Sequence, residues 1–417
     1  MINACEVLKN LGIPEEQWTR LIPGWGQSMV NMPERIDILS PDVIHDVCRQ
    51  CSLDEGIAEQ LINTAELIAA SMSLRSFFWH TFFKLSVLHY TYGNASVSFA
   101  GWPALKQLSN KSGLFYLLAV LGLIPSALRK FQEMNTPDSV IKDTLNIKAN
   151  VDFYRNIHGQ PGLDPLVISW YRHYVTGRIF TLGRFQYKIA ELFAFGAMLC
   201  NRSDGRKLLV AEGGIRYDQE GYVVSDGCEA DSDWYSTFEE TEDKICGYAV
   251  SPYGFILSEK RNFSKKDWEP VLRKGDILLD MHIPPGGKMT PEAVFESFSM
   301  AFRFFSDRFP GRYVPAIICR SWIFNTQFEE LLPDSNLAEL MRRCYLFPCA
   351  STGKDGFFFL FGRDYSNLKE APHDTSVRRA MLSILERGDR LRLGGMLFLY
   401  EDLKHYNENI YRTQFKV

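Results

Sequence analysis

LLDMHIPPGGKMTPEAVFESFSMAFRFF, residues 278–305, is the stretch that decides the fold of the second half of the chain. Its first residues, Leu278 to Ile283, predict a strand, and Pro284 to Met289 predict a tight turn. A helix is expected from Thr290 onward, because Thr290 suits a helix N-cap and a proline follows it. Phenylalanines then recur at spacings of three and four, which places them on one apolar stripe of the helix: Phe295, Phe298, Phe302, Phe305 and Phe309.

The turn between this strand and this helix carries two adjacent glycines, Gly286 and Gly287. Free backbone N–H groups at a strand–turn–helix junction can hold a phosphate. The turn is not a Walker A loop, because no Gly-Lys-Ser/Thr follows, and it lacks the third glycine of a Rossmann fingerprint. A purely structural turn remains an alternative. Since ligands favour the carboxyl ends of strands and His282 adjoins the turn, we expect a phosphate-bearing cofactor here.

Length and composition indicate a globular protein of two or three domains. The chain has 417 residues, a formal net charge of −4, 46% hydrophobic residues and 23% charged residues, which gives no sign of a nucleic-acid partner. The longest uncharged stretch, Ser112–Leu128, is shorter than the roughly 20 residues of a membrane span, so a buried core helix is expected and no membrane partner.

Cysteine usage and the N-terminal sequence indicate the compartment. The nine cysteines show no disulfide framework, and the N-terminal sequence lacks the basic start and apolar run of a signal peptide. Both features predict reduced thiols in a cytoplasmic protein. The pair Cys48 and Cys51 has no second CxxC pair beside it, so no metal site is expected.

The pattern along the chain divides it into an all-helical domain over residues 1–140 and a mixed domain over residues 141–417. No alternating strand pattern competes with the helices of the first part, whereas strands dominate after Gly177. The fold class predicted is therefore α+β. The strands expected in the second domain include Gly183–Ile189, Tyr248–Ser258, Asp276–Ile283, Arg312–Cys319, Phe357–Phe361 and Leu393–Tyr400.

Several short motifs resemble a known family. They are Leu182 to Gln186 (LGRFQ), His282 to Gly287 (HIPPGG) with Glu292-Ala293, Cys319 to Trp322 (CRSW) and Leu332 to Asn336 (LPDSN). This combination resembles bacterial acyltransferase-like proteins that join an all-helical N-terminal domain to a C-terminal domain similar to the GNAT N-acetyltransferases. The resemblance implies a GNAT-like second domain, in which the central strand ends at a splayed pair and the following turn cradles the pyrophosphate of coenzyme A.

The resemblance also implies a cofactor and its binding residues. Acetyl-CoA or another acyl-CoA would serve as co-substrate, held by Pro285, Gly286, Gly287, Lys288, Met289 and Thr290. Lys288 would add a point charge. The turn departs from the superfamily's usual Arg/Gln-x-x-Gly-x-Gly/Ala pattern.

Acyl transfer to an amine requires a base for the ammonium, stabilisation of the oxyanion and an acid for the departing thiolate. We expect His282 to be the base, with a strand-end histidine of structural role as the alternative. Glu292 either serves the helix start or takes part in catalysis, and Cys319 is a candidate acid or nucleophile. Acceptor binding is assigned to Gln186, Ser321 and Trp322, and Trp322 is alternatively plain core.

The function expected from this combination is an acyl-CoA-dependent N-acyltransferase that acts on a small amine or amino sugar. Two alternatives remain open at this stage. One is a non-catalytic protein that binds coenzyme A or a nucleotide as a sensor or scaffold, and the other is an interaction protein with a degenerate GNAT-like domain. The sequence leaves the oligomeric state open.

Overall fold

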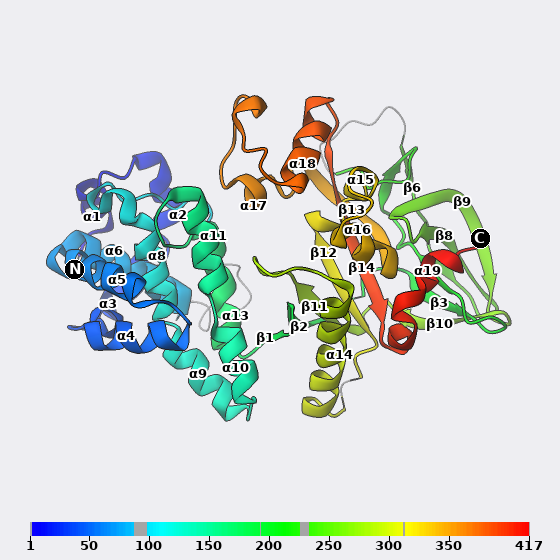
Figure 1. Ribbon diagram of the computed structural model, residues 1–417, viewed down its shortest axis with the longest axis horizontal. Coiled ribbons are helices and arrows are strands. Elements are labelled where there is room, and N and C mark those ends of the chain that lie inside the picture. The colour runs from blue at the N-terminus through cyan, green and yellow to red at the C-terminus, as the bar shows by residue number, and fades with distance from the viewer. Residues whose placement is uncertain (1, 87–97, 192, 226–232, 312, 417) are drawn as a thin grey trace. The chain divides into compact units, whose positions relative to one another are not determined.

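The computed structural model describes residues 2–86, 98–191, 193–225, 233–311 and 313–416. Two compact units divide the chain. One comprises residues 1–181 together with 284–286, and the other comprises residues 182–283 and 287–417. Figure 1 labels the helices and strands of both units.

The first unit is helical, as the sequence predicts, and its helices continue to Val175. Its longer helices are α1 (Ala4–Asn10), α3 (Trp25–Val30), α4 (Pro41–Gln50), α5 (Glu55–Ala70), α6 (Met72–Ser86), α8 (Ser112–Leu121), α9 (Ile124–Glu133), α10 (Asp138–Leu145) and α11 (Lys148–His158). Short turns of helix complete it: α2 (Trp18–Leu21), α12 (Pro165–Ile168) and α13 (Arg172–Val175), with 3₁₀ segments at Glu15–Gln17, Asp37–Leu39, Lys106–Lys111 and Ser169–Tyr171.

Helix α8 forms the core of this unit, and all of its residues are buried. Phe115 on α8 packs against Phe77 and Phe78 of α6, with ring centroids 5.8 and 5.3 Å apart. An all-round apolar helix of this kind belongs in the interior of a helical array. The sequence prediction of a buried core helix at this place is confirmed.

The second unit contains a mixed main sheet and a second sheet whose strands pair antiparallel. The main sheet has the order β1 (Ile179–Leu182), β2 (Phe185–Glu191), β11 (Ile277–His282), β12 (Ala316–Ser321), β14 (Leu391–Leu399) and β13 (Tyr345–Gly353). A second sheet has the order β10 (Trp268–Arg273), β3 (Ala197–Asn201), β4 (Lys207–Val210), β8 (Lys244–Ser251) and β7 (Glu239–Glu240), with β9 (Phe255–Ser264) paired to β8. A small pair joins β5 (Arg216–Asp218) to β6 (Asp233–Tyr235).

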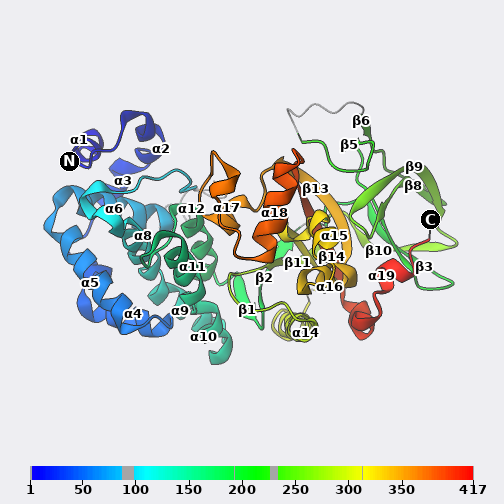
Figure 2. The ribbon, with the colours of Figure 1, turned by 45° about the horizontal axis from the view of Figure 1, so that its top comes forward.

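Different elements cover the two faces of the main sheet. On one face lies α14 (Pro291–Arg308), seen almost end-on in Figure 2, which packs Phe298 against Phe398 with ring centroids 5.1 Å apart. On the other face, Tyr345 donates a hydrogen bond to the carbonyl of Val250 in the second sheet at 2.5 Å. The remaining helical segments are α15 (Gln327–Leu331), α16 (Asn336–Arg343), α17 (Phe357–Phe361), α18 (Ser376–Glu386) and α19 (Ile410–Thr413), with 3₁₀ segments at Trp322–Phe324, Leu368–Glu370 and Tyr400–Glu408.

One predicted strand is wrong. Phe357–Phe361 forms the short helix α17 and not a strand, and it lies between Gly356 and Gly362, both in the left-handed conformation. A short apolar run has no periodicity that separates a strand from a buried helical turn, so the two glycines decide its conformation.

Candidate functional site: a strand–turn–helix junction

The segment singled out by the sequence folds as predicted: β11 ends at His282, an exposed turn follows, and α14 begins at Pro291. Gly286 has φ of +79° and Gly287 has φ of +69°. Two consecutive residues in the left-handed region require glycine, because a Cβ would approach the following carbonyl oxygen. The glycine pair therefore fixes the course of the turn.

The amides of this turn have no internal partner within the described part of the chain. The N–H groups of Gly286, Gly287, Lys288 and Met289 donate no backbone or side-chain hydrogen bond there. Gly286, Gly287 and Lys288 are exposed, and Met289 is half-buried. Unbonded amides that face solvent at a helix entrance are available for an anion.

The first turn of α14 is different, because its donors are already used. Pro291 has no N–H, Ala293 donates to the Thr290 hydroxyl at 3.3 Å, and Val294 donates to the Thr290 carbonyl at 3.0 Å. The carboxylate of the exposed Glu292 accepts hydrogen bonds from its own backbone N–H and from the Thr290 side chain. Both bonds lower the pKa of Glu292, the backbone one more strongly. Thr290 and Glu292 therefore stabilise the helix start in this structure, and the free donors come from the turn before it.

The two central strands of the sheet separate beside this turn. β11 and β12 pair in parallel only at Leu279 with Ile317 and at Asp280 with Ile318. β11 nevertheless stays paired with β2 as far as His282, and β12 stays paired with β14 as far as Ser321. The ends of β11 and β12 thus lack a ladder between them, which is the splayed pair expected from the resemblance.

Polar residues gather on one face of this splayed edge. His282 is paired in register with Gln186, and Asp280 with Lys188, so all four lie on the same face of the sheet. Lys188 Nζ lies 3.2 Å from Asp280 Oδ2. Burial, and next the charge of Lys188, lower the pKa of His282 to about 4. The imidazole is therefore neutral at pH 7, in the state that can accept a proton.

Cys319 lies on the opposite face of the sheet. Its register partner Met396 and the alternation along β12 place it with Ile317 and Phe398, on the face that α14 covers. It is 2% exposed, and burial raises the pKa of its thiol far above the usual range. The structure therefore does not bring Cys319 and His282 together on one face.

Ser321 and Trp322 both have structural contacts at the end of β12. The Ser321 hydroxyl accepts a hydrogen bond from the N–H of Ile323 at 3.4 Å. Trp322 lies against Gly356, where a Cβ would come within 2.5 Å of the indole, and against the ring of Phe328. Both side chains remain half-buried.

Two basic residues at this site received no role in the sequence analysis. They are Lys188, which is paired with Asp280, and Arg184, whose side chain lies beside Gly287. The signal was present, because Arg184, Gln186 and Lys188 alternate with apolar residues and therefore share the polar face of one strand. What the sequence could not show is which strand lies beside β2.

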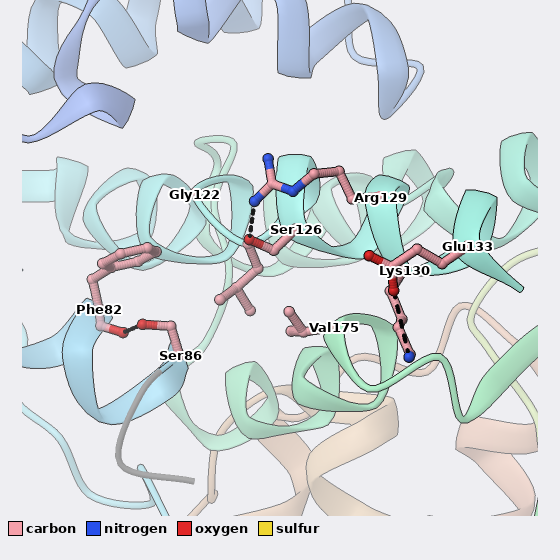
Figure 3. A pocket seen from close by; sticks show the side chains of 9 residues that line it. Phe82, Ser86, Gly122, Ser126, Arg129, Lys130, Glu133 and Val175 are labelled. Atoms are coloured by element: carbon pink, nitrogen blue, oxygen red, sulfur yellow. Dashed lines mark hydrogen bonds and ion pairs between the residues drawn. The ribbon is translucent and has the colours of Figure 1, made fainter. Parts of the chain in front are cut away.

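A separate pocket lies in the helical unit (Figure 3). It has a volume of about 470 Å³, and its walls are formed by Phe82, Ser86, Gly122, Leu123, Ser126, Arg129, Lys130, Glu133 and Val175. Its polar groups are paired with neighbours: Ser86 donates to the Phe82 carbonyl, Arg129 donates to Ser126, and Lys130 lies 3.6 Å from Glu133. Because these polar groups already have partners, we assign no ligand to this pocket.

Among the residues that the structure describes, no three His, Cys, Asp or Glu side chains are placed so that they could hold a metal ion together. One helical run in the described part of the chain, Lys106–Glu133, is long and apolar enough to cross a membrane, but 72% of its most apolar part is buried inside the protein. A core helix of a globular unit has the same properties, so this observation is weak evidence for a membrane span.

Comparison with known proteins identifies the class. A family model described as a GNAT-like C-terminal domain matches residues 179–397, which is more than half of the chain. A second, described as an N-acyltransferase N-terminal domain, matches residues 42–177. The chain therefore belongs to the family defined by this GNAT-like domain, and the resemblance noted in the sequence is confirmed. The α+β fold class is likewise confirmed.

Solved structures of acyltransferases share this fold. An acyltransferase in complex with CoA and 10C-teicoplanin superposes with a TM-score of 0.64 at 20% identity, covering 95% of this chain and 99% of that chain. An acyltransferase with decanoyl-CoA and teicoplanin gives 0.62 at 20% identity, and an acyltransferase mutant with octanoyl-CoA gives 0.61 at 19%, each with the same coverage. At this identity the likeness shows the fold. No curated protein matched the chain.

Proposed function

We propose that this protein is an acyl-CoA-dependent N-acyltransferase whose acceptor is a small amine or amino sugar. The observation that carries the proposal is the set of unbonded amides from Gly286 to Met289, the first three in exposed residues, at the place where the resemblance puts the coenzyme A pyrophosphate. The related folds solved with CoA, octanoyl-CoA or decanoyl-CoA support an acyl-CoA as the co-substrate, with no preference for the acetyl form.

His282 is the proposed general base. Its imidazole, with a pKa of about 4, is neutral at pH 7 and lies half-buried at the splayed end of β11. It would take a proton from the acceptor ammonium, after which the free amine attacks the thioester carbonyl. The C–S bond then breaks, and the departing thiolate takes up the second proton that the attacking nitrogen loses as it becomes an amide. Gln186, paired in register with His282, is proposed to contact the acceptor, together with Ser321 and Trp322.

Two of the catalytic roles expected from the sequence depend on the conformation of this structure. Glu292 is engaged by the start of α14, and Cys319 is buried beneath the sheet face that α14 covers. A catalytic role for either would require a rearrangement of these contacts, so His282 is the residue on which the mechanism depends. The eight cysteines that lie in the described ranges are free thiols, which supports the proposal of a cytoplasmic location.

A binding protein without turnover is the second candidate function. The observation that favours it is the low pKa of His282, about 4, which makes the imidazole a weak base for an amine of ordinary basicity. Such a protein would use the same turn to hold coenzyme A.

One experiment separates these functions. Coenzyme A is added to the full chain during thermal unfolding, and one hundred times its dissociation constant is expected to stabilise the protein by about 2.7 kcal/mol. Release of free thiol from octanoyl-CoA is then measured with a panel of amines and amino sugars. His282→Gln should abolish thiol release and keep the thermal shift, whereas His373→Gln, at an exposed position elsewhere, should change neither.

Two results would contradict the proposal. Absence of any coenzyme A stabilisation in the wild-type chain would exclude both the enzyme and the binding protein. Stabilisation without turnover on any acceptor of the panel would favour the binding protein.

A further inference from the structure

Arg184 is held at the glycine turn by a rigid support. It follows Gly183 in the two-residue connection between β1 and β2. The buried hydroxyl of Ser297 on α14 donates to the Leu182 carbonyl at 2.5 Å, and the N–H of Phe185 donates to that hydroxyl at 3.2 Å. One side chain of α14 therefore fixes both ends of the connection that carries Arg184.

The connection also lies close to α14 itself. Gly183 has φ of +66°, and a Cβ there would lie 3.2 Å from the Cα and Cβ of Ser297. Glycine is thus required for its backbone conformation and favoured by the close packing. The position of Arg184 is set by backbone and buried contacts, which reduces the entropy lost when its side chain binds a ligand.

The Arg184 side chain reaches the turn that precedes α14. Its Cδ and Nε lie 3.2 Å from the position that a Cβ on Gly287 would occupy, and its Cζ lies 3.7 Å from that position. Its guanidinium also lies over the Phe185 ring, 5.4 Å from the centroid. Gly287, by lacking a side chain, lets a cation lie directly against a backbone whose amides are unbonded.

The charges around the turn favour an anion. Arg184 is half-buried, and desolvation lowers its pKa from the ordinary guanidinium value, so its charge is partly stripped of water. Lys288 is exposed on the turn itself. A guanidinium matches the geometry of phosphate oxygens with paired N–H groups, which an isolated lysine cannot do.

We infer that Arg184 is a binding residue for the diphosphate of coenzyme A, acting together with the amides of the Gly286–Gly287 turn. This inference rests on the proposed function, because it takes coenzyme A as the ligand of the turn. It adds a cation from the β1–β2 connection to a turn whose sequence departs from the superfamily's usual pattern.

The test compares three ligands with three variants. Dissociation constants are measured by calorimetry for coenzyme A, for dephospho-CoA, which lacks the 3′-phosphate, and for pantetheine, which lacks the diphosphate. The variants are Arg184→Gln, the conservative Arg184→Lys, and Arg303→Gln, which removes the same charge from an exposed position on α14. Thermal unfolding without ligand confirms that each variant is folded.

The expected pattern is specific to the diphosphate. Arg184→Gln should weaken coenzyme A and dephospho-CoA by at least tenfold each and leave pantetheine unchanged within twofold. Arg184→Lys should recover part of the loss, and Arg303→Gln should bind all three ligands as the wild-type protein does.

Each other outcome has a definite meaning. Equal coenzyme A affinity in wild type and Arg184→Gln overturns the inference and leaves the proposed function intact. A loss for coenzyme A but not for dephospho-CoA assigns Arg184 to the 3′-phosphate and also overturns it. An equal loss for pantetheine shows a general distortion of the site, and no binding of coenzyme A to the wild-type chain refutes the proposed function itself.

Discussion

Replacing Gly287 by alanine tests the turn most directly, because the structure predicts two separable effects. The first is strain: Gly287 has φ of +69°, where a residue with a Cβ costs roughly 1–2 kcal/mol. The second is displacement: the new Cβ would lie 3.2 Å from Arg184 Cδ and Nε. Since the arginine side chain is flexible, the contact is relieved by movement of Arg184 and adds little to the strain.

A matched variant isolates the strain. Gly388 has φ of +83°, and a Cβ there meets nothing within 4 Å. Gly388→Ala should therefore lose about the same 1–2 kcal/mol as Gly287→Ala in the absence of ligand. The two variants differ only in what surrounds the added methyl group.

Thermal unfolding with and without coenzyme A is the assay. In wild type and Gly388→Ala, saturating coenzyme A should raise the melting temperature by the same amount. In Gly287→Ala the rise should shrink strongly, because the methyl group displaces Arg184 and occupies the surface where the phosphate oxygens approach the amides. A full rise in Gly287→Ala would refute the assignment of this turn to coenzyme A.

Three other substitutions test contacts of the junction and of the helical core. Lys188→Met removes the positive charge that, after burial, helps to lower the pKa of His282 from 6.5 to about 4. The pKa should therefore rise, and the acid limb of the pH profile of kcat/KM should move to higher pH. An acid limb that does not move would contradict the role of His282 as the base. Ser297→Ala breaks three buried hydrogen bonds and should lower the free energy of unfolding in urea by about 1–3 kcal/mol. Ser299→Ala, at a half-buried position whose hydroxyl donates only to the Phe295 carbonyl of its own helix, should change it by less than about 0.5 kcal/mol. Burial lowers the pKa of His80 to about 3, so the folded state disfavours a proton that the unfolded chain binds near pH 6.5. The free energy of unfolding should therefore fall as the pH drops from about 6.5 toward 3, by up to roughly 5 kcal/mol. In His80→Gln the urea midpoint should depend less steeply on pH over this range.

Sequence predictions were correct where the structure depends on neighbouring residues, and they failed or were not possible where it depends on contacts between distant segments. The helix after Thr290 was predictable because one helix face repeats every three to four residues. The helix at Phe357–Phe361 was not, since five consecutive apolar residues carry no period and the conformation is imposed by the glycines on either side. The hairpin-like pair β8 and β9 was predictable from the Ser251 to Gly254 turn, whereas the membership of β3, β4 and β10 in a second sheet depends on contacts distant in the sequence.

The candidate site shows the same division. Gly286, Gly287 and His282 were identified from sequence because a glycine pair and a histidine at a strand end are local features. That Cys319 and His282 lie on opposite faces depends on how far β12 is shifted along β11, and a shift of one residue would exchange the faces. The placement of Arg184 depends on the hydrogen bonds that Leu182 and Phe185 make with Ser297, a residue more than a hundred positions further along the chain.

The sequence by itself determined the helical first half, the strand–turn–helix junction and the family, because short-range patterns of side chains and glycines indicate each of them. Only the tertiary structure decided which side chains face that junction. Register and packing between distant segments place Lys188 beside Asp280 and Arg184 against Gly287, and they bury Cys319 under α14. These placements arise because buried faces must fill space together, and no single stretch of the chain carries that information.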